Sequence, residues 1–220
     1  MNESPFANHA ERLAAFARCA IYPVVSSEFC AGRPVPEVVR ALAQGGAGIV
    51  QMREKHLPGR DKWALAQELR AITREAGMLL IIDDDLGLAI ACGADGVHLG
   101  QDDLPAAAAR AAAPELLLGA STHNPAEIAA AQADGFSYLN IGPVFPTQTK
   151  AVPQPVVGLD HLREWLPLSR IPTTVMGGIK PRHIPELRAL GCRHLAMVTA
   201  LTQAPDIAAA CRECLALANA

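Results

Sequence analysis

Three polar side chains alternate along a short apolar run of the sequence. Gln51, Arg53 and Lys55 lie two residues apart, and alternate residues of a β-strand point to one face, so all three are expected on the same side. A guanidinium fork and an ammonium ion suit a diphosphate or another polyanion. The alternative is a solvent-exposed strand end, with Glu54 and Asp61 as partners. Burying such groups without a ligand is costly, which favours an anion-binding site.

Five carboxylates follow two later apolar runs. Asp83, Asp84 and Asp85 end the first run, and Asp102 and Asp103 follow the second. Such groups repel one another at a shared sheet edge unless a cation binds, and Mg²⁺ accepts one or two carboxylates together with phosphate oxygens. Asp85 and Asp103 also precede predicted helices, so N-capping is an alternative for these two.

A further polar segment, residues 119 to 124, ends the next apolar run. Ser121 can donate a hydrogen bond to a phosphate, and Asn124 can cap the following helix. For His123 two interpretations stay open, an acid or base at the site and a polar surface residue.

Two more segments suit anions. Thr147, Thr149 and Lys150 place two hydroxyls and an ammonium within four residues, on a long proline-rich connection of the kind that closes over a site. Residues 177 to 179 (Gly-Gly-Ile) and residues 198 and 199 (Val-Thr) follow the last two predicted strands, where barrels often bind a monophosphate through backbone amides.

Short apolar runs and alanine-rich amphipathic segments alternate along the chain, as in parallel strands joined by helices. The sequence predicts eight strands: Ile21 to Ser26, Gly48 to Arg53, Met78 to Asp83, Gly96 to Leu99, Leu116 to Ala120, Tyr138 to Ile141, Thr173 to Met176 and His194 to Val198. Predicted helices include Asn8 to Cys19, Asp61 to Glu75, Pro125 to Asp134, Leu159 to Leu166, Pro181 to Leu190 and Pro205 to Leu217.

This pattern predicts an α/β fold, a single (β/α)₈ TIM barrel over residues 1–220 with residues 1–19 as an extra N-terminal helix. An open, flavodoxin-like sheet is the rival. The polar segments follow at least six different strands, which favours the rim of a closed barrel over one crevice of an open sheet.

Composition narrows the function class. A formal net charge of -3 gives no basic surface for nucleic acid. Apolar stretches stay short of a membrane span and no signal peptide is recognised, so we expect a cytoplasmic protein with small-molecule partners. Six cysteines are expected as reduced thiols, and the Cys211 and Cys214 pair lacks a second pair for zinc. A homo-oligomer is compatible with these features.

Taken in order, six motifs resemble the thiamine phosphate synthase family: QMREK (51–55), DDD (83–85), GADGVHLGQDDLP (93–105), GASTHN (119–124), GPVFPTQTK (142–150) and MGGI (176–179). The resemblance covers about residues 48 to 203. It implies a transferase that joins a pyrimidine methyl diphosphate to a thiazole ethyl phosphate, or its 2-carboxy form, by a dissociative, Mg²⁺-assisted substitution that releases diphosphate.

The resemblance also assigns roles by motif. Gln51, Arg53 and Lys55 would bind the pyrimidine diphosphate, Asp84 and Asp103 would bind Mg²⁺, and Ser121 and Lys150 would contact the diphosphate, with Arg53, Lys55 and Lys150 as the catalytic cations. A second set would hold the thiazole phosphate: Thr147, Thr149, Gly178, Val198 and Thr199.

One position departs from the family pattern. Asp83 stands where the family usually has asparagine, and an added carboxylate beside a diphosphate weakens binding unless it is protonated, turned away or recruited to the metal. Its substrate-binding role is therefore an open question. Two alternatives remain in the same superfamily: a thiazole tautomerase-like isomerase, which would use His123, and a non-catalytic barrel that binds thiazole phosphate.

Overall fold

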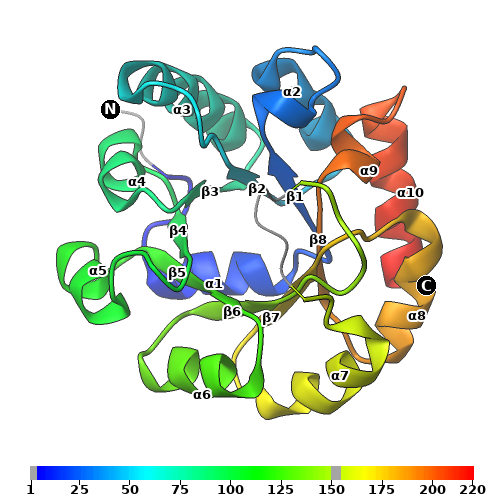
Figure 1. Cartoon of the computed structure of the whole chain (residues 1–220). Helices are drawn as coiled ribbons and strands as arrows, with labels where there is room; N and C mark the ends of the chain where they lie inside the picture. The colour runs from blue at the N-terminus through cyan, green and yellow to red at the C-terminus, as the bar shows by residue number, and fades with distance from the viewer. Residues whose placement is uncertain (1–3, 150–154) are drawn as a thin grey trace.

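A computed structural model describes residues 4–149 and 155–220. Its eight strands are all parallel and pair in chain order, and β8 pairs with β1 to close the ring (Figure 1). This closure confirms the predicted (β/α)₈ barrel and excludes the open sheet. The strands are β1 (Ile21–Val25), β2 (Ile49–Met52), β3 (Leu79–Asp83), β4 (Gly96–Leu99), β5 (Leu117–Thr122), β6 (Tyr138–Ile141), β7 (Thr173–Met176) and β8 (His194–Met197).

Helices surround the ring, and one more lies across it. The helix α1, blue in Figure 1, passes behind the strands and closes the end where they begin. The α-helices are α1 (His9–Ala17), α2 (Val35–Gln44), α3 (Gly59–Glu75), α4 (Leu86–Cys92), α5 (Ala106–Ala112), α6 (Pro125–Ala133), α7 (Gly158–Trp165), α8 (Ile184–Ala189), α9 (Thr199–Thr202) and α10 (Ile207–Asn219). Three 3₁₀ turns add η1 (Ser27–Phe29), η2 (Leu166–Leu168) and η3 (Pro181–His183).

The barrel interior changes from apolar to polar along the strands. Near the α1 end, Phe16 is buried against Tyr22, Tyr138 and the ring of His194. Leucine and isoleucine side chains of β2, β3 and β5 complete this apolar cluster. Alternate residues point to one face of a strand, so two steps further along β2 and β3 the same faces carry the polar side chains of the site. The apolar cluster therefore supports the site from below.

The predicted elements agree with the observed ones except at some ends. β5 continues to Thr122, two residues beyond its predicted end, because residues 121 and 122 pair with β6 and Thr122 Oγ1 donates to Asn140 O. α10 begins at Ile207 because Asp206 accepts a hydrogen bond from Ala209 N and caps the helix. The predicted helix over residues 181–190 is a 3₁₀ turn followed by α8.

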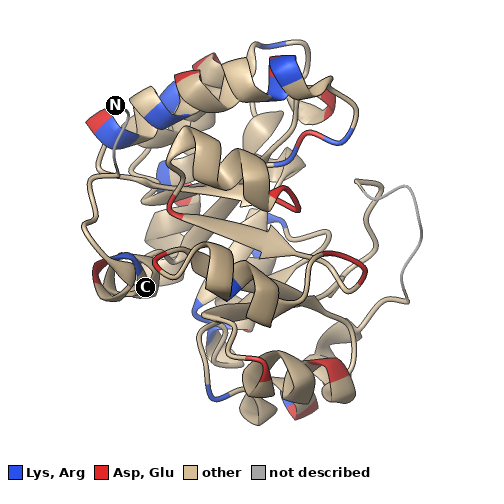
Figure 2. Cartoon of the chain, turned by 90° about the vertical axis from the view of Figure 1, so that its left-hand side faces the viewer, with Lys and Arg blue, Asp and Glu red and all other residues tan. Residues whose placement is uncertain are grey.

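The surface charges are mixed. Along the helices in Figure 2, basic and acidic residues are interspersed, without a basic band on the side shown. Within residues 4–149 and 155–220, no helix has the length and apolar character needed to cross a membrane.

Candidate active site

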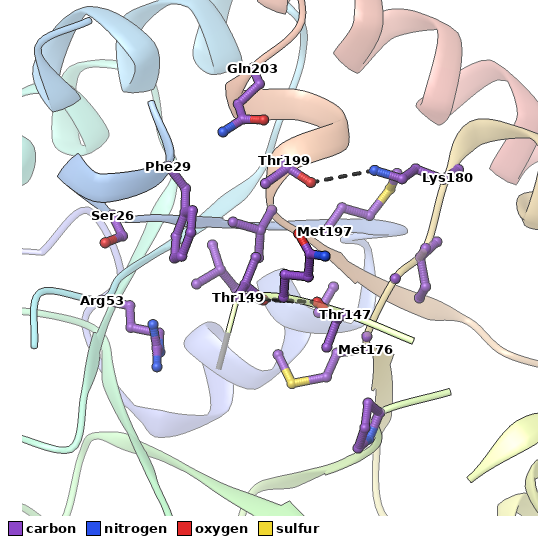
Figure 3. Close-up of a pocket in the computed structure, with 18 of the residues that line it drawn as sticks. Ser26, Phe29, Arg53, Thr147, Thr149, Met176, Lys180, Met197, Thr199 and Gln203 are labelled. Carbon is purple, nitrogen blue, oxygen red and sulfur yellow. Dashed lines mark hydrogen bonds between the residues drawn. The ribbon is translucent and has the colours of Figure 1, made fainter. Parts of the chain in front are cut away.

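A cavity of about 500 Å³ opens where the strands end. Its wall includes Arg53 from the end of β2, Thr147 and Thr149 from the segment after β6, and Lys180 and Thr199 from the segments after β7 and β8 (Figure 3). Four segments far apart in the sequence thus contribute to one space. Such a cavity, at the carboxyl ends of barrel strands, is the usual location of a barrel active site.

Gln51 lies in β2, and Arg53 and Lys55 follow its end. Gln51 is buried and its side-chain amide donates to Tyr22 Oη at 3.3 Å, whereas Arg53 reaches the cavity. Lys55 extends to the end of β3, where its Nζ contacts the carboxylates of Asp83 and Asp84. Burial lowers the pKa of Lys55, but these two carboxylates outweigh it and leave the pKa above its ordinary value. Lys55 is therefore held as a cation.

Asp83 turns toward the cations of β2. Its carboxylate lies 2.8 Å from Lys55 Nζ and 3.6 Å from Arg53 Nε. Burial and the neighbouring Asp84 raise the pKa of Asp83, although both cations oppose that shift. The Asp83 carboxylate therefore occupies a position beside Arg53 and Lys55 that an anionic ligand would otherwise take.

Asp84 and Asp103 approach each other from neighbouring strand ends. Asp84 has a left-handed backbone with φ +60°, a conformation that aspartate tolerates better than most residues. Asp103 accepts a hydrogen bond from Gly100 N at 2.6 Å. Burial raises the pKa of Asp103, and the adjacent Asp84 carboxylate raises it further. The approach of these two carboxylates makes their surroundings favourable for a cation.

The carboxylates of Asp84 and Asp103 suit Mg²⁺ better than a metal whose ligands all come from the protein. Both groups offer oxygen ligands, which Mg²⁺ prefers. Across residues 4–149 and 155–220 there is no cluster of three or more histidine, cysteine, aspartate or glutamate side chains that could hold a metal ion. Mg²⁺ commonly takes one or two carboxylates and completes its shell with water and substrate phosphates. Asp84 and Asp103 fit that requirement.

A chain of buried hydrogen bonds connects opposite sides of the barrel below the cavity. His98 lies 3.0 Å from Ser121 Oγ through Nε2 and 3.1 Å from Tyr138 Oη through Nδ1. Tyr138 Oη in turn lies 2.9 Å from Tyr22 Oη, which accepts from Gln51. The predicted binding residues of β2 and β5 are thus held by one connected polar layer, which fixes where their donors point.

The segment after β6 packs on the glycines after β7. Thr147 and Thr149 bring their hydroxyl oxygens to 3.0 Å on the cavity wall. A Cβ added at Gly178 would lie 2.4 Å from Pro146 O, and Gly178 has φ +64°. Close loop packing thus requires glycine here, a reason distinct from the approach of a backbone to an anion.

The sequence matches the model of the family described as thiamine monophosphate synthase over residues 21–201. The chain belongs to the thiamine monophosphate synthase family. It is 41% identical over 199 residues to the thiamine-phosphate synthase of Chloroflexus aurantiacus, covering 90% of this chain and 92% of that one. The Pelotomaculum thermopropionicum thiamine-phosphate synthase is 39% identical over 193 residues, with 87% and 88% covered.

A solved structure is similar over most of the chain. The thiamine phosphate pyrophosphorylase from Pyrococcus furiosus superposes with a TM-score of 0.83 at 33% identity, covering 91% of this chain and 96% of that one. The predicted family and the predicted enzyme class, a thiamine-phosphate synthase transferase, are thereby confirmed. Barrels below 25% identity, such as 3-hexulose-6-phosphate synthase with a TM-score of 0.65 at 18% identity, share the fold.

For this member of the thiamine monophosphate synthase family, the predicted site residues fall into three groups. The cavity wall holds Arg53, Thr147, Thr149, Gly178, Val198 and Thr199. Beside it, Lys55 joins Asp83 and Asp84, with Asp103 adjacent. Gln51 and Ser121 belong to the polar layer beneath. Lys150 lies outside the described residues.

Three neighbouring residues have local structural partners. Asp85 caps α4 by accepting from Leu88 N at 2.8 Å, and Asn124 caps α6. His123 Nδ1 lies 2.9 Å from Glu127 Oε2, and His123 does not line the cavity. The capping alternative thus holds for Asp85 but not for Asp103, because α5 begins after Pro105.

Several cavity residues were not expected from the sequence. The wall also contains Ser26, Phe29, Lys180 and Gln203. Ser26 continues the alternation of Tyr22 and Val24 on β1, which is the signal that could have identified it. Lys180 directly follows the Gly-Gly-Ile segment, but neither periodicity nor the family motifs indicate where its side chain points.

Proposed function

We propose that the chain is a thiamine phosphate synthase acting on 4-amino-2-methyl-5-(diphosphomethyl)pyrimidine and 4-methyl-5-(2-phosphoethyl)thiazole or its 2-carboxy form. The similarity to two thiamine-phosphate synthases supports this. The observation that carries the proposal is the convergence of Arg53 and Lys55 with Asp84 and Asp103 beside the cavity. That arrangement combines cations for a diphosphate with oxygen ligands for Mg²⁺.

The proposed reaction begins with departure of the diphosphate. The bond between the pyrimidine methylene and the diphosphate oxygen breaks, and both electrons leave with the oxygen. Arg53 and Lys55 donate to the departing oxygens, Ser121 adds a hydroxyl donor, and Lys150 would add a third cation. Mg²⁺, when bound by Asp84 and Asp103, would neutralise further charge on the diphosphate.

The second step forms the carbon–nitrogen bond. The amino group of the pyrimidine stabilises positive charge on the methylene, and the lone pair of the thiazole nitrogen attacks that carbon. With the 2-carboxy form, the carboxyl group would also leave as carbon dioxide, its bonding electrons remaining on the ring carbon, which then takes a proton. Thr147, Thr149, Gly178, Val198 and Thr199 would hold the thiazole phosphate so that its nitrogen faces the methylene. No side-chain nucleophile is needed, so the protein's contribution is positioning and charge stabilisation.

The proposal predicts that purified protein with Mg²⁺ forms thiamine phosphate from the two substrates. Lys55→Ala and Asp84→Asn should each lower kcat by about 10²- to 10³-fold, the usual effect of removing one group that stabilises developing charge. Asparagine at position 84 also tolerates the left-handed backbone. Product formation is measured by chromatography, with circular dichroism as the check on folding.

The matched control is Lys62→Ala, a lysine on α3 outside the cavity wall, which should retain full turnover. Wild-type protein that binds the thiazole phosphate but yields no thiamine phosphate with Mg²⁺ would contradict the proposal. That outcome would favour the isomerase or the non-catalytic barrel, although the pairing of His123 with Glu127 gives the isomerase no added support.

A further inference from the structure

Lys180 places a cation on the wall of the cavity away from the diphosphate cations. It follows Ile179 after β7 and lines the cavity with Thr199, which follows β8. Its Nζ donates to Thr199 Oγ1 at 3.4 Å, the contact drawn as a dashed line in Figure 3. Arg53 lies on the opposite side of the cavity in that view. The two cations therefore serve different parts of the same space.

Lys180 differs from the other cations of the site in its partners. Arg53 faces Asp83, and Lys55 faces both Asp83 and Asp84. Among the residues that the structure describes, no carboxylate lies within 4 Å of Lys180 Nζ. A half-buried ammonium is stabilised by an anion far more than by one neutral hydroxyl. The unmatched charge thus points to an anionic ligand in the cavity.

The backbone of Lys180 is fixed to the loop after β6. Lys180 N donates to His183 Nδ1 at 3.2 Å, and the His183 ring stacks on Phe145 with centroids 4.1 Å apart. Burial lowers the pKa of His183, which favours the neutral ring that can accept that bond. Only the flexible side chain of Lys180 needs to move for its ammonium to meet a ligand.

We propose that Lys180 binds the monophosphate of the thiazole substrate, together with Thr199. The ammonium and the hydroxyl lie close enough to donate to different oxygens of one phosphate group. The diphosphate is the poorer match, because its cations and carboxylates gather around Lys55 at the ends of β2 and β3. This inference rests on the proposed function, since it assumes that the thiazole phosphate enters this cavity.

The test measures binding of two ligands by calorimetry without the pyrimidine substrate: the thiazole phosphate and the corresponding alcohol, which lacks the phosphate. Lys180→Met keeps the length and apolar stem of the side chain and removes its charge. It should weaken binding of the thiazole phosphate by about ten- to a hundredfold, the scale of a lost hydrogen bond to a charged group. Affinity for the alcohol should stay unchanged.

The control is Arg182→Met. Arg182 lies two residues after Lys180, and its side chain is exposed and outside the cavity wall, so this variant removes a nearby positive charge that does not face the cavity. It should bind both ligands as the wild type does. In turnover assays, Lys180→Met should raise KM for the thiazole phosphate and leave KM for the pyrimidine diphosphate unchanged. Lys180→Arg should restore part of the lost affinity, because it restores the charge.

Equal affinity of Lys180→Met and wild type for the thiazole phosphate, with turnover intact, would overturn this inference and leave the proposed function standing. An equal loss of affinity for the alcohol would also overturn it, since that pattern reflects packing and not charge. Wild-type protein that binds neither ligand, whether alone or with inorganic diphosphate and Mg²⁺ present, would overturn both proposals together. Lys180→Gln provides a second neutral variant if the methionine variant fails to fold.

Discussion

Asp83 brings a carboxylate to two cations that a diphosphate would also contact. The carboxylate lies 2.8 Å from Lys55 Nζ and 3.6 Å from Arg53 Nε, so its negative charge satisfies them when no substrate is bound. An incoming diphosphate must displace or share these contacts. The asparagine that the family resemblance implies here would carry no charge. Under the proposed function, Asp83 therefore changes the electrostatics of substrate binding.

We expect Asp83→Asn to lower KM for the pyrimidine diphosphate by about fivefold, which corresponds to an ion-pair interaction of roughly 1 kcal/mol. The competing charge disappears, while Lys55 keeps its contact with Asp84. Steady-state kinetics at fixed Mg²⁺ measure the change, and Asp102→Asn, at an exposed neighbouring carboxylate, is the control. An unchanged KM would show that the diphosphate does not compete with Asp83.

At the residue level, the sequence predicted which side chains point in the same direction, but not every residue that they contact. The two-residue spacing of Gln51, Arg53 and Lys55 predicted a common direction, and the structure brings Arg53 and Lys55 to the same carboxylate, Asp83. The pairing of Lys55 with Asp83 and Asp84 depends on β2 and β3 being neighbours, which chain order made predictable. The backbone of Lys180 is held by His183, a local contact three residues away. His183 in turn stacks on Phe145, a contact between loops that no local pattern encodes.

Among the elements, β5 shows how closely the polar layer is packed. A Cβ added at Gly119 would lie 2.2 Å from Tyr138 Cζ and 2.6 Å from His98 Nδ1. Since neither ring can move without breaking the chain of hydrogen bonds to Ser121 and Tyr22, glycine is required by the packing of its neighbours. Its backbone conformation is not the reason, because Gly119 is absent from the residues with positive φ.

Gly119→Ala should therefore lower the free energy of unfolding by about 1–3 kcal/mol, the usual cost of overpacking a filled interior. Urea denaturation followed by circular dichroism measures the change. Gly59→Ala is the control, because a Cβ there meets nothing within 4 Å. If both variants unfolded at the same urea concentration, the rings of the polar layer would have to be freer to shift than their contacts indicate.

The elements were predictable where apolar runs are bounded by polar or glycine residues, and less so elsewhere. The observed β6 and β7 have the predicted limits. The end of β5 was missed because Ser121 and Thr122 are polar, although they still pair with β6. The start of α10 was misplaced because proline at 205 suggested a first turn, whereas Asp206 supplies the cap.

For the whole molecule, the sealed end of the barrel couples stability to pH. His194 is buried there, and its Nδ1 donates to Cys19 O at 2.7 Å. Burial lowers the pKa of His194 below its usual 6.5, an effect that Arg188 and Arg193 reinforce. The folded state thus holds the ring neutral, while the unfolded chain takes up the proton. Stability is present above pH 6.5 and is lost as the pH falls below it.

His194→Asn should flatten this dependence, since the asparagine amide can donate to Cys19 O but does not titrate in this range. Measured between pH 8 and pH 5 by urea denaturation, the free energy of unfolding should fall more for the wild type than for the variant. His56→Asn, at an exposed loop histidine, should follow the wild type. Parallel curves for wild type and His194→Asn would contradict this assignment.

The helix α1 has a consequence for how molecules pass through the enzyme. With Phe16 filling the interior at that end, we expect both reactants and both products to pass through the opposite end, where the cavity lies. The reactant that binds deeper in the cavity must then bind first, and the product that lies deeper must be released last. By closing one end of the barrel, α1 would thereby impose a compulsory order of binding and release, which product-inhibition patterns would reveal.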